Sequence, residues 1–196
     1  MLRRTFAVVA ATAVLALSLV ACASDPGGGT ATTPPPASPT ASVTPSEEPT
    51  VPPAAANVPT DCTQVGSAAT RAATVDQLNL QGDGTGFVRP APEGATLALG
   101  CDWFAGDATG FLLLISTTDA ASADVTVESL AAQGWTCGAG PDGEGDTCTI
   151  TTPNSQYPVD TVETVITRGD VWIYSSATNV DGAALLSDLQ TSIWAS

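Results

Sequence analysis

The 196-residue chain has 20 acidic residues against five basic ones, a formal net charge of −15 at pH 7, and no histidine. So acidic a surface repels nucleic acid and anionic lipid head groups, and its simplest role is to keep the protein soluble. All five basic residues are arginines, so serine hydrolysis assisted by histidine or lysine and zinc catalysis on histidine ligands are disfavoured.

The N-terminus has the pattern of an export signal. Arg3 and Arg4 precede an uncharged apolar run, residues 6–20, which is short for a membrane-spanning helix and typical of a signal-peptide core. The run ends in Leu19-Val20-Ala21-Cys22, which resembles the lipobox of bacterial lipoproteins. The resemblance implies that residues 1–21 are a lipoprotein signal peptide. It also implies that Cys22 receives acyl chains and holds the protein on the extracytoplasmic face of the cell membrane.

Two alternatives concern this signal. The cysteine could be incidental to an ordinary secretory signal. Arg3-Arg4-Thr5-Phe6 also resembles part of a twin-arginine export motif. That route exports folded proteins from a reducing compartment, so a domain that needs disulfides favours export of the unfolded chain.

Residues 22–60 are predicted to be a disordered tether. Residues 23–60 contain ten of the 15 prolines and no aromatic, leucine, isoleucine or methionine residue. Such a composition buries too little apolar surface to offset the entropy lost on ordering. The threonines beside prolines are candidate sites for O-linked sugar.

Residues 61–196 are predicted to form one α+β domain: an antiparallel sheet of about five strands with about three helices on one face. Leu97, Leu99, Cys101 and Trp103 alternate with small or polar residues, which predicts a strand with these four on its buried face. The other predicted strands are 111–115, apolar on both faces, then 147–152, 159–167 and 171–176, the last two joined by a Gly169-Asp170 hairpin turn.

Three helices are predicted around these strands. The first begins at Asp61, with Cys62, Val65, Ala69 and Ala72 on one face. A loop region follows, covering 82–86 and 89–94. The second helix is capped by Thr118 or Asp119 and ends at Gly134; its inward residues are Ala123, Val127, Leu130 and Ala131. The third is capped by Asp181, and its inner residues are Leu185, Leu186, Leu189 and Ile193.

Four cysteines remain once Cys22 is lipidated, and an even number in an exported chain predicts two disulfides. Four cysteines allow three connectivities; we expect Cys62–Cys101, from helix to sheet, and Cys137–Cys148, across a Gly-rich loop. A four-cysteine zinc site is the alternative, but its paired spacing is absent. The arrangement of Cys62 followed by Cys101-Asp102-Trp103 is similar to uncharacterised actinobacterial lipoprotein domains, and we assign no site residue from it.

Carboxylate chemistry of the glycosidase type is the enzymatic class that this composition leaves open. No carboxylate pair stands out among 20 acidic residues, so no catalytic residue is predicted. Asp142, Glu144 and Asp146 alternate in a Gly-rich loop, but the rest of a calcium-loop pattern is missing, and we predict a solvated loop without metal. Arg168-Gly169-Asp170 matches an adhesive tripeptide, and its place in a hairpin explains it.

The four tryptophans are Trp103, Trp135, Trp172 and Trp194; they could line a ligand cleft, but packing in the core is favoured.

The predicted function is a cell-surface lipoprotein that serves as a non-catalytic binding or envelope-interaction module without cofactor. Its partners would be the membrane through lipidated Cys22 and a small apolar ligand, cell-wall material or another envelope protein, with no nucleic acid. The alternatives are a carboxylate-dependent glycosidase acting on cell-wall polysaccharide and a structural spacer without ligand. An apolar cavity under the sheet would favour the binding module.

Overall fold

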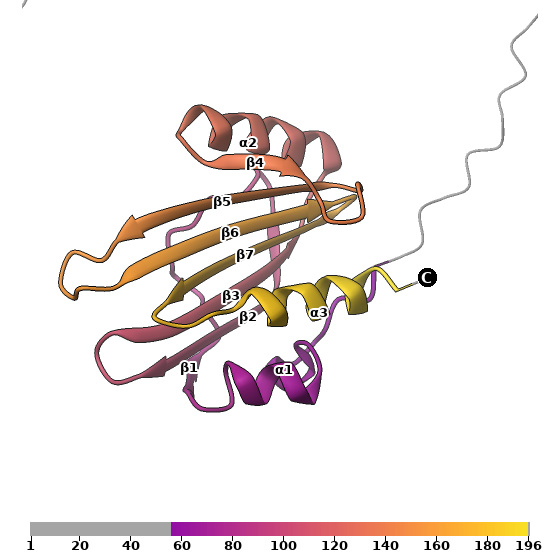
Figure 1. Cartoon of the computed structure of the whole chain (residues 1–196). Helices are drawn as coiled ribbons and strands as arrows, with labels where there is room; N and C mark the ends of the chain where they lie inside the picture. The colour runs from indigo at the N-terminus through magenta and orange to yellow at the C-terminus, as the bar shows by residue number, and fades with distance from the viewer. Residues whose placement is uncertain (1–55, 196) are drawn as a thin grey trace, which may run out of the picture. The chain divides into compact units, whose positions relative to one another are not determined.

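The computed structural model describes residues 56–195. Their centre is a seven-stranded sheet in the order β1-β2-β3-β7-β6-β5-β4, in which all neighbours are antiparallel (Figure 1). The strands are β1 (Asn79–Gly82), β2 (Thr96–Ala105), β3 (Thr109–Thr117), β4 (Thr136–Ala139), β5 (Asp146–Pro153), β6 (Asp160–Arg168) and β7 (Val171–Thr178). The predicted α+β class and antiparallel sheet are confirmed.

The prediction of five strands is an undercount. The five expected strands correspond to β2, β3, β5, β6 and β7. The two that were missed, β1 and β4, are the outermost strands, with four residues each. No residue of either strand is fully buried, so neither has the alternation of buried and exposed residues by which a half-buried strand is recognised.

The helices cover both faces of the sheet. Leu113 of β3 belongs to a cluster on what we call the first face, and Leu112 and Leu114 belong to a cluster on the second face. Helix α3 (Ala183–Ile193) packs on the first face, with the short α1 (Ala68–Ala73) beside it, whereas α2 (Ala120–Ala132) packs on the second (Figure 1). The prediction of all helices on one face is therefore wrong. A central strand that is apolar on both sides needs cover on both sides.

Strand β2 contains a register shift that corrects the predicted buried face. The pairing with β3 shifts between Leu97 and Leu99. Because the side-chain period of a strand is two, one extra residue moves the following side chains to the other face. Leu99, Cys101 and Trp103 accordingly face the first cluster, whereas Leu97 packs against the second.

The predicted first helix is divided in two. Asp61 caps a 3₁₀ turn, η1 (Cys62–Gln64), and Ser67 caps α1 through a capping box with Thr70. Gly66 separates them with φ of +66°, a left-handed conformation that ends a helix readily only at glycine. The predicted inward residues Ala69 and Ala72 are consequently exposed.

The other two helices begin and end close to the predicted positions. Asp119 caps α2, and the bonds from Gly134 N to Ala131 O and from Trp135 N to Leu130 O form the expected Schellman-type end. In α2, Ala123 and Leu130 are buried, whereas Ala131, predicted to point inward, is exposed.

The start of α3 differs slightly from the prediction, and its inner stripe agrees with it. Asp181 precedes the N-cap residue Gly182 and accepts a bond from Ala183 N. The predicted inner residues of α3 are all buried: Leu185, Leu186, Leu189 and Ile193.

The loop between β1 and β2, residues 83–95, covers part of the second face. A Cβ at Gly100 would lie 1.8 Å from Asp83 O, so only glycine lets the loop approach β2 this closely. Further along, Arg89 Nη2 donates to Ser116 Oγ at 2.9 Å, and Trp172 Nε1 donates to Pro90 O at 3.2 Å. The loop and α2 thus together cover the second face of the sheet.

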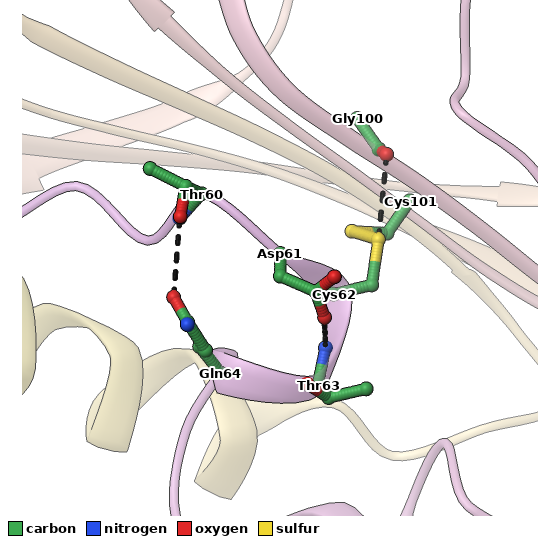
Figure 2. The surroundings of a disulfide bond; sticks show 7 residues. All are labelled: Thr60, Asp61, Cys62, Thr63, Gln64, Gly100 and Cys101. Atoms are coloured by element: carbon green, nitrogen blue, oxygen red, sulfur yellow. Dashed lines mark hydrogen bonds between the residues drawn. A yellow bond between two sulfur atoms is a disulfide. The ribbon is translucent and has the colours of Figure 1, made fainter.

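Both predicted disulfides are present. Cys62–Cys101 joins η1 to β2, and Cys62 Sγ lies 3.5 Å from Gly100 O (Figure 2). Cys137–Cys148 links directly opposed residues of β4 and β5. Cys148 is fully buried in the second-face cluster, so this bridge also belongs to the packing under α2.

The chain is packed from Ala56 onward. Ala56 and Val58 contact the first-face cluster, and Asn57 N donates to Ile193 O at 2.8 Å. The predicted signal peptide 1–21, the lipidation site Cys22 and the tether as far as residue 55 lie outside the described residues. None of the described helices is long and apolar enough to cross a membrane.

Candidate functional site

Two pockets lie one after the other between α3 and β6 on the first face. The apolar pocket has a volume of about 280 Å³ and lies at the start of α3. The polar pocket, about 330 Å³, lies at its end. Along this side of α3, Ala183 and Leu186 line the first pocket, and Ser187, Gln190, Thr191 and Trp194 line the second. The two pockets exist because no described helix lies on the first face beyond α3, over β5 and β4 (Figure 1).

The apolar pocket is formed where small side chains meet larger ones. Its apolar lining consists of Phe111, Val162, Ala177, Val180, Ala183 and Leu186. Val162 and Ala177 are directly opposed on β6 and β7, and Val162 is 39% exposed although it lies on the core side of the sheet. An apolar residue that remains exposed inside a pocket is surface that a ligand could cover.

Two hydroxyl-bearing side chains lie on the wall of the apolar pocket. Ser175 of β7 and Thr164 of β6 are directly opposed, and both line the apolar pocket. Ser175 is 1% exposed and Thr164 is half-buried. As polar side chains on an otherwise mostly apolar wall, they are the groups that could form a hydrogen bond with a molecule in the pocket.

The polar pocket is held together by Arg168. Its Nη1 lies 2.9 Å from Asp142 Oδ2, and its Nη2 lies 3.5 Å from Glu144 Oε2. Its guanidinium carbon is also 5.8 Å from the centre of the Trp194 ring, which is within the range of a cation–π contact. Arg168 thereby joins the β4–β5 loop to the end of α3.

The acidic cluster predicted as a solvated loop is engaged by this arginine. Asp142 Oδ1 also accepts a bond from Glu144 N, and Asp146 lies in β5. Within residues 56–195, no three histidine, cysteine, aspartate or glutamate side chains are arranged to hold a metal ion. The Arg168-Gly169-Asp170 tripeptide forms the β6–β7 hairpin turn, as predicted, and its arginine is turned toward the cluster.

The tryptophans divide between core and pocket positions. Trp103 is buried and packs near Phe111, with ring centres 6.1 Å apart, and Trp172 is fully buried. Trp135 is half-buried beside the second-face cluster, whereas Trp194 lines the polar pocket. Of the four tryptophans, only Trp194 lines a pocket alongside α3, so only its ring could contact a ligand there.

The second face has two carboxylates in one row across the sheet. Asp102 and Glu163 are aligned through Leu112 and Ser176, three strand spacings or about 14 Å apart. Glycosidase pairs are about 5 to 10 Å apart. Glu163 Oε1 accepts a bond from the Tyr174 hydroxyl, whose pKa is raised by burial and by this partner, and burial raises the pKa of Asp102.

Sequence reasoning singled out Trp194, Asp142 and Glu144 but missed most of the apolar pocket. A signal was present at one position: Ser175 interrupts an otherwise apolar inward pattern in β7, where a core residue would be expected. Val162 and Ala177 gave no such signal, since apolar residues in strands normally pack.

The chain matches no protein-family model, no curated protein and no solved structure.

Proposed function

We propose that this protein is a non-catalytic binding module held on the extracytoplasmic face of the cell membrane by lipidated Cys22. The Leu19-Val20-Ala21-Cys22 sequence, behind a short apolar run, supports the anchor. Two acyl chains would make the attachment stable, since one chain alone binds a membrane only marginally.

The observation that carries the binding role is the apolar pocket with its two hydroxyls. A ligand there would cover Val162, Ala177 and Leu186 and could bond to Ser175 and Thr164. Covering apolar surface contributes about 25 cal/mol per Å², and the paired hydroxyls would orient the ligand. The ligand that fits is small, largely apolar and not anionic, since the Asp181 carboxylate also lines the pocket, and it carries one hydrogen-bonding group. A spacer without ligand would have no need of this hollow.

Two carboxylate pairs in residues 56–195 do not favour a glycosidase. Asp102 and Glu163 share a face but lie too far apart to act on one glycosidic bond. Asp142 and Glu144 are each paired with Arg168. The binding module therefore remains our single proposal.

A pair of neighbouring alanines provides the test. Ala183 and Ala184 are both exposed in the first turn of α3, but only Ala183 lines the apolar pocket. N-Phenyl-1-naphthylamine, an uncharged apolar fluorophore, should bind the protein saturably at one site. Ala183→Leu should fill the pocket and weaken binding at least about tenfold, which corresponds to about 1.4 kcal/mol.

The matched control is Ala184→Leu, which adds the same side chain outside the pocket and should bind like the wild type. Absence of saturable binding, or equal affinity in both variants and the wild type, would contradict the proposed site.

A further inference from the structure

The apolar and polar pockets form two parts of one groove between β6 and α3. Alternate residues of β6 line the two pockets in chain order: Val162, Thr164, Ile166 and Arg168. The first two of these line the apolar pocket and the last two line the polar pocket. On α3 the neighbouring residues Leu186 and Ser187 likewise line different pockets. The stretch of β6 from Val162 to Arg168 is about 20 Å long, so the groove is elongated.

The chemistry of the groove changes from one end to the other. Its apolar end contains Phe111 and Val162, whereas its polar end contains Arg168 with its carboxylate partners and the half-buried ring of Trp194. Thr164 follows Val162 in the β6 row, so its hydroxyl side chain lies toward the polar end of the apolar pocket. A molecule that covers the whole groove needs an apolar part and a polar part in this order.

We propose, on the basis of the apolar ligand proposed above, that the groove binds a single-chain amphiphile with an uncharged head group that carries hydroxyls. Its apolar chain lies in the apolar pocket, and its head group lies in the polar pocket against Trp194. Thr164 and Ser175 are directly opposed on β6 and β7, where they can donate to the oxygen that links the chain to the head group.

The charges at the polar pocket favour an uncharged head group. Asp142 and Glu144 carry two negative charges against the one positive charge of Arg168, so an anionic head group is repelled. A cationic head group would compete with Arg168, which has a high effective concentration because it belongs to the same chain. Hydroxyl groups can donate to the carboxylate oxygens, and the indole of Trp194 offers an apolar surface to a sugar ring.

Displacement of N-phenyl-1-naphthylamine by two competitors provides the test. The sample is the chain from residue 22 with Cys22→Ala, which retains both disulfide pairs. The competitors are 1-octanol and octyl β-D-glucoside, which have the same apolar chain and oxygen; the glucoside adds the sugar and is used below its micelle concentration. Trp194→Ala should weaken the glucoside at least about fivefold and leave the affinity for 1-octanol within about twofold, because only the sugar contacts the ring.

A second pair of variants leaves Trp194 in place. Thr191 and Ser192 are both exposed, and the hydroxyl of each donates to a carbonyl of α3, but only Thr191 lines the polar pocket. Thr191→Leu should weaken the glucoside more than 1-octanol, because it replaces a polar group at the head-group position by an apolar one. Ser192→Leu is the matched control and should bind both competitors like the wild type.

The possible results separate this proposal from the proposed apolar site. If both competitors displace the dye, but Trp194→Ala and Thr191→Leu affect them equally or not at all, the head group does not occupy the polar pocket. The amphiphile proposal would then be wrong, and the apolar site would stand. If the dye does not bind saturably, or neither competitor displaces it, both proposals fail.

Discussion

Ser116 and Ser175 show how much the environment of a single buried hydroxyl matters. Both lie in central strands, with 0% and 1% of their surfaces exposed. Ser116 Oγ accepts a bond from Arg89, whose pKa is lowered by burial, whereas the Ser175 hydroxyl faces the apolar pocket. The Ser116 hydroxyl thus provides a hydrogen-bond acceptor for a partly buried charge, whereas the Ser175 hydroxyl is bonded to no charged side chain within the described residues.

This contrast gives a prediction for stability. Ser116→Ala should lower the free energy of unfolding by about 1–3 kcal/mol, because Arg89 loses a hydrogen-bond acceptor. Ser175→Ala should change it by less than about 0.5 kcal/mol, because the Ser175 side chain lines the pocket and is not bonded to a partly buried charge. Urea unfolding of the two variants compares them directly. An equal loss in both would mean that the Ser175 hydroxyl is already satisfied, which removes its role in the pocket.

At the scale of elements, local patterns predicted the strands and helices whose burial is one-sided or complete. The inner stripe of α3 and the doubly apolar β3 are of this kind. The edge strands β1 and β4 were missed because they bury little, and the face of Leu97 was wrong because a bulge follows it. The face that α2 covers depends on the path of the connections that join α2 to the neighbouring strands. The residues of α2 themselves do not determine this path.

The candidate site was less predictable for the same reason. The apolar pocket exists because α3 leaves Val162 and Thr164 of β6 uncovered, and this depends on the position of α3 over the sheet. In the sequence, Val162 and Ala177 look like ordinary core residues. The Cys62–Cys101 disulfide was predictable because Cys101 lies on the apolar side of a clearly patterned strand, and Cys137–Cys148 because its two cysteines flank a short Gly-rich loop.

The two disulfides should differ only moderately in what they contribute. Chain entropy alone gives about 4 kcal/mol for Cys62–Cys101, which spans 39 residues, and about 3 kcal/mol for Cys137–Cys148, which spans 11. Since Cys101 and Cys148 are both fully buried, replacing either pair by alanine also loses core contacts. We expect the Cys62→Ala/Cys101→Ala variant to be the less stable by about 1 kcal/mol.

Urea unfolding of both double variants, under oxidising conditions, measures this difference. A larger loss for Cys137→Ala/Cys148→Ala would show that packing under α2, and not loop length, decides the contribution of these bridges.

At the scale of the whole molecule, the proposed arrangement is an acidic domain on a tether. As a flexible coil the predicted tether would extend about 35 Å, and as polyproline about 100 Å, so the domain would stand clear of the lipid surface. The negative charge of the chain keeps it away from anionic head groups. The apolar pocket would then be open to ligands from the surroundings of the cell.

Attachment through Cys22 is the claim on which this arrangement depends, and membrane fractionation with intact-mass analysis tests it most directly. We predict that the wild type is found with membranes and that its mass fits a chain that begins at a lipid-modified Cys22. Cys22→Ala should appear in the soluble fraction without that modification. A wild-type protein that is soluble, with Cys22 unmodified, would contradict the account.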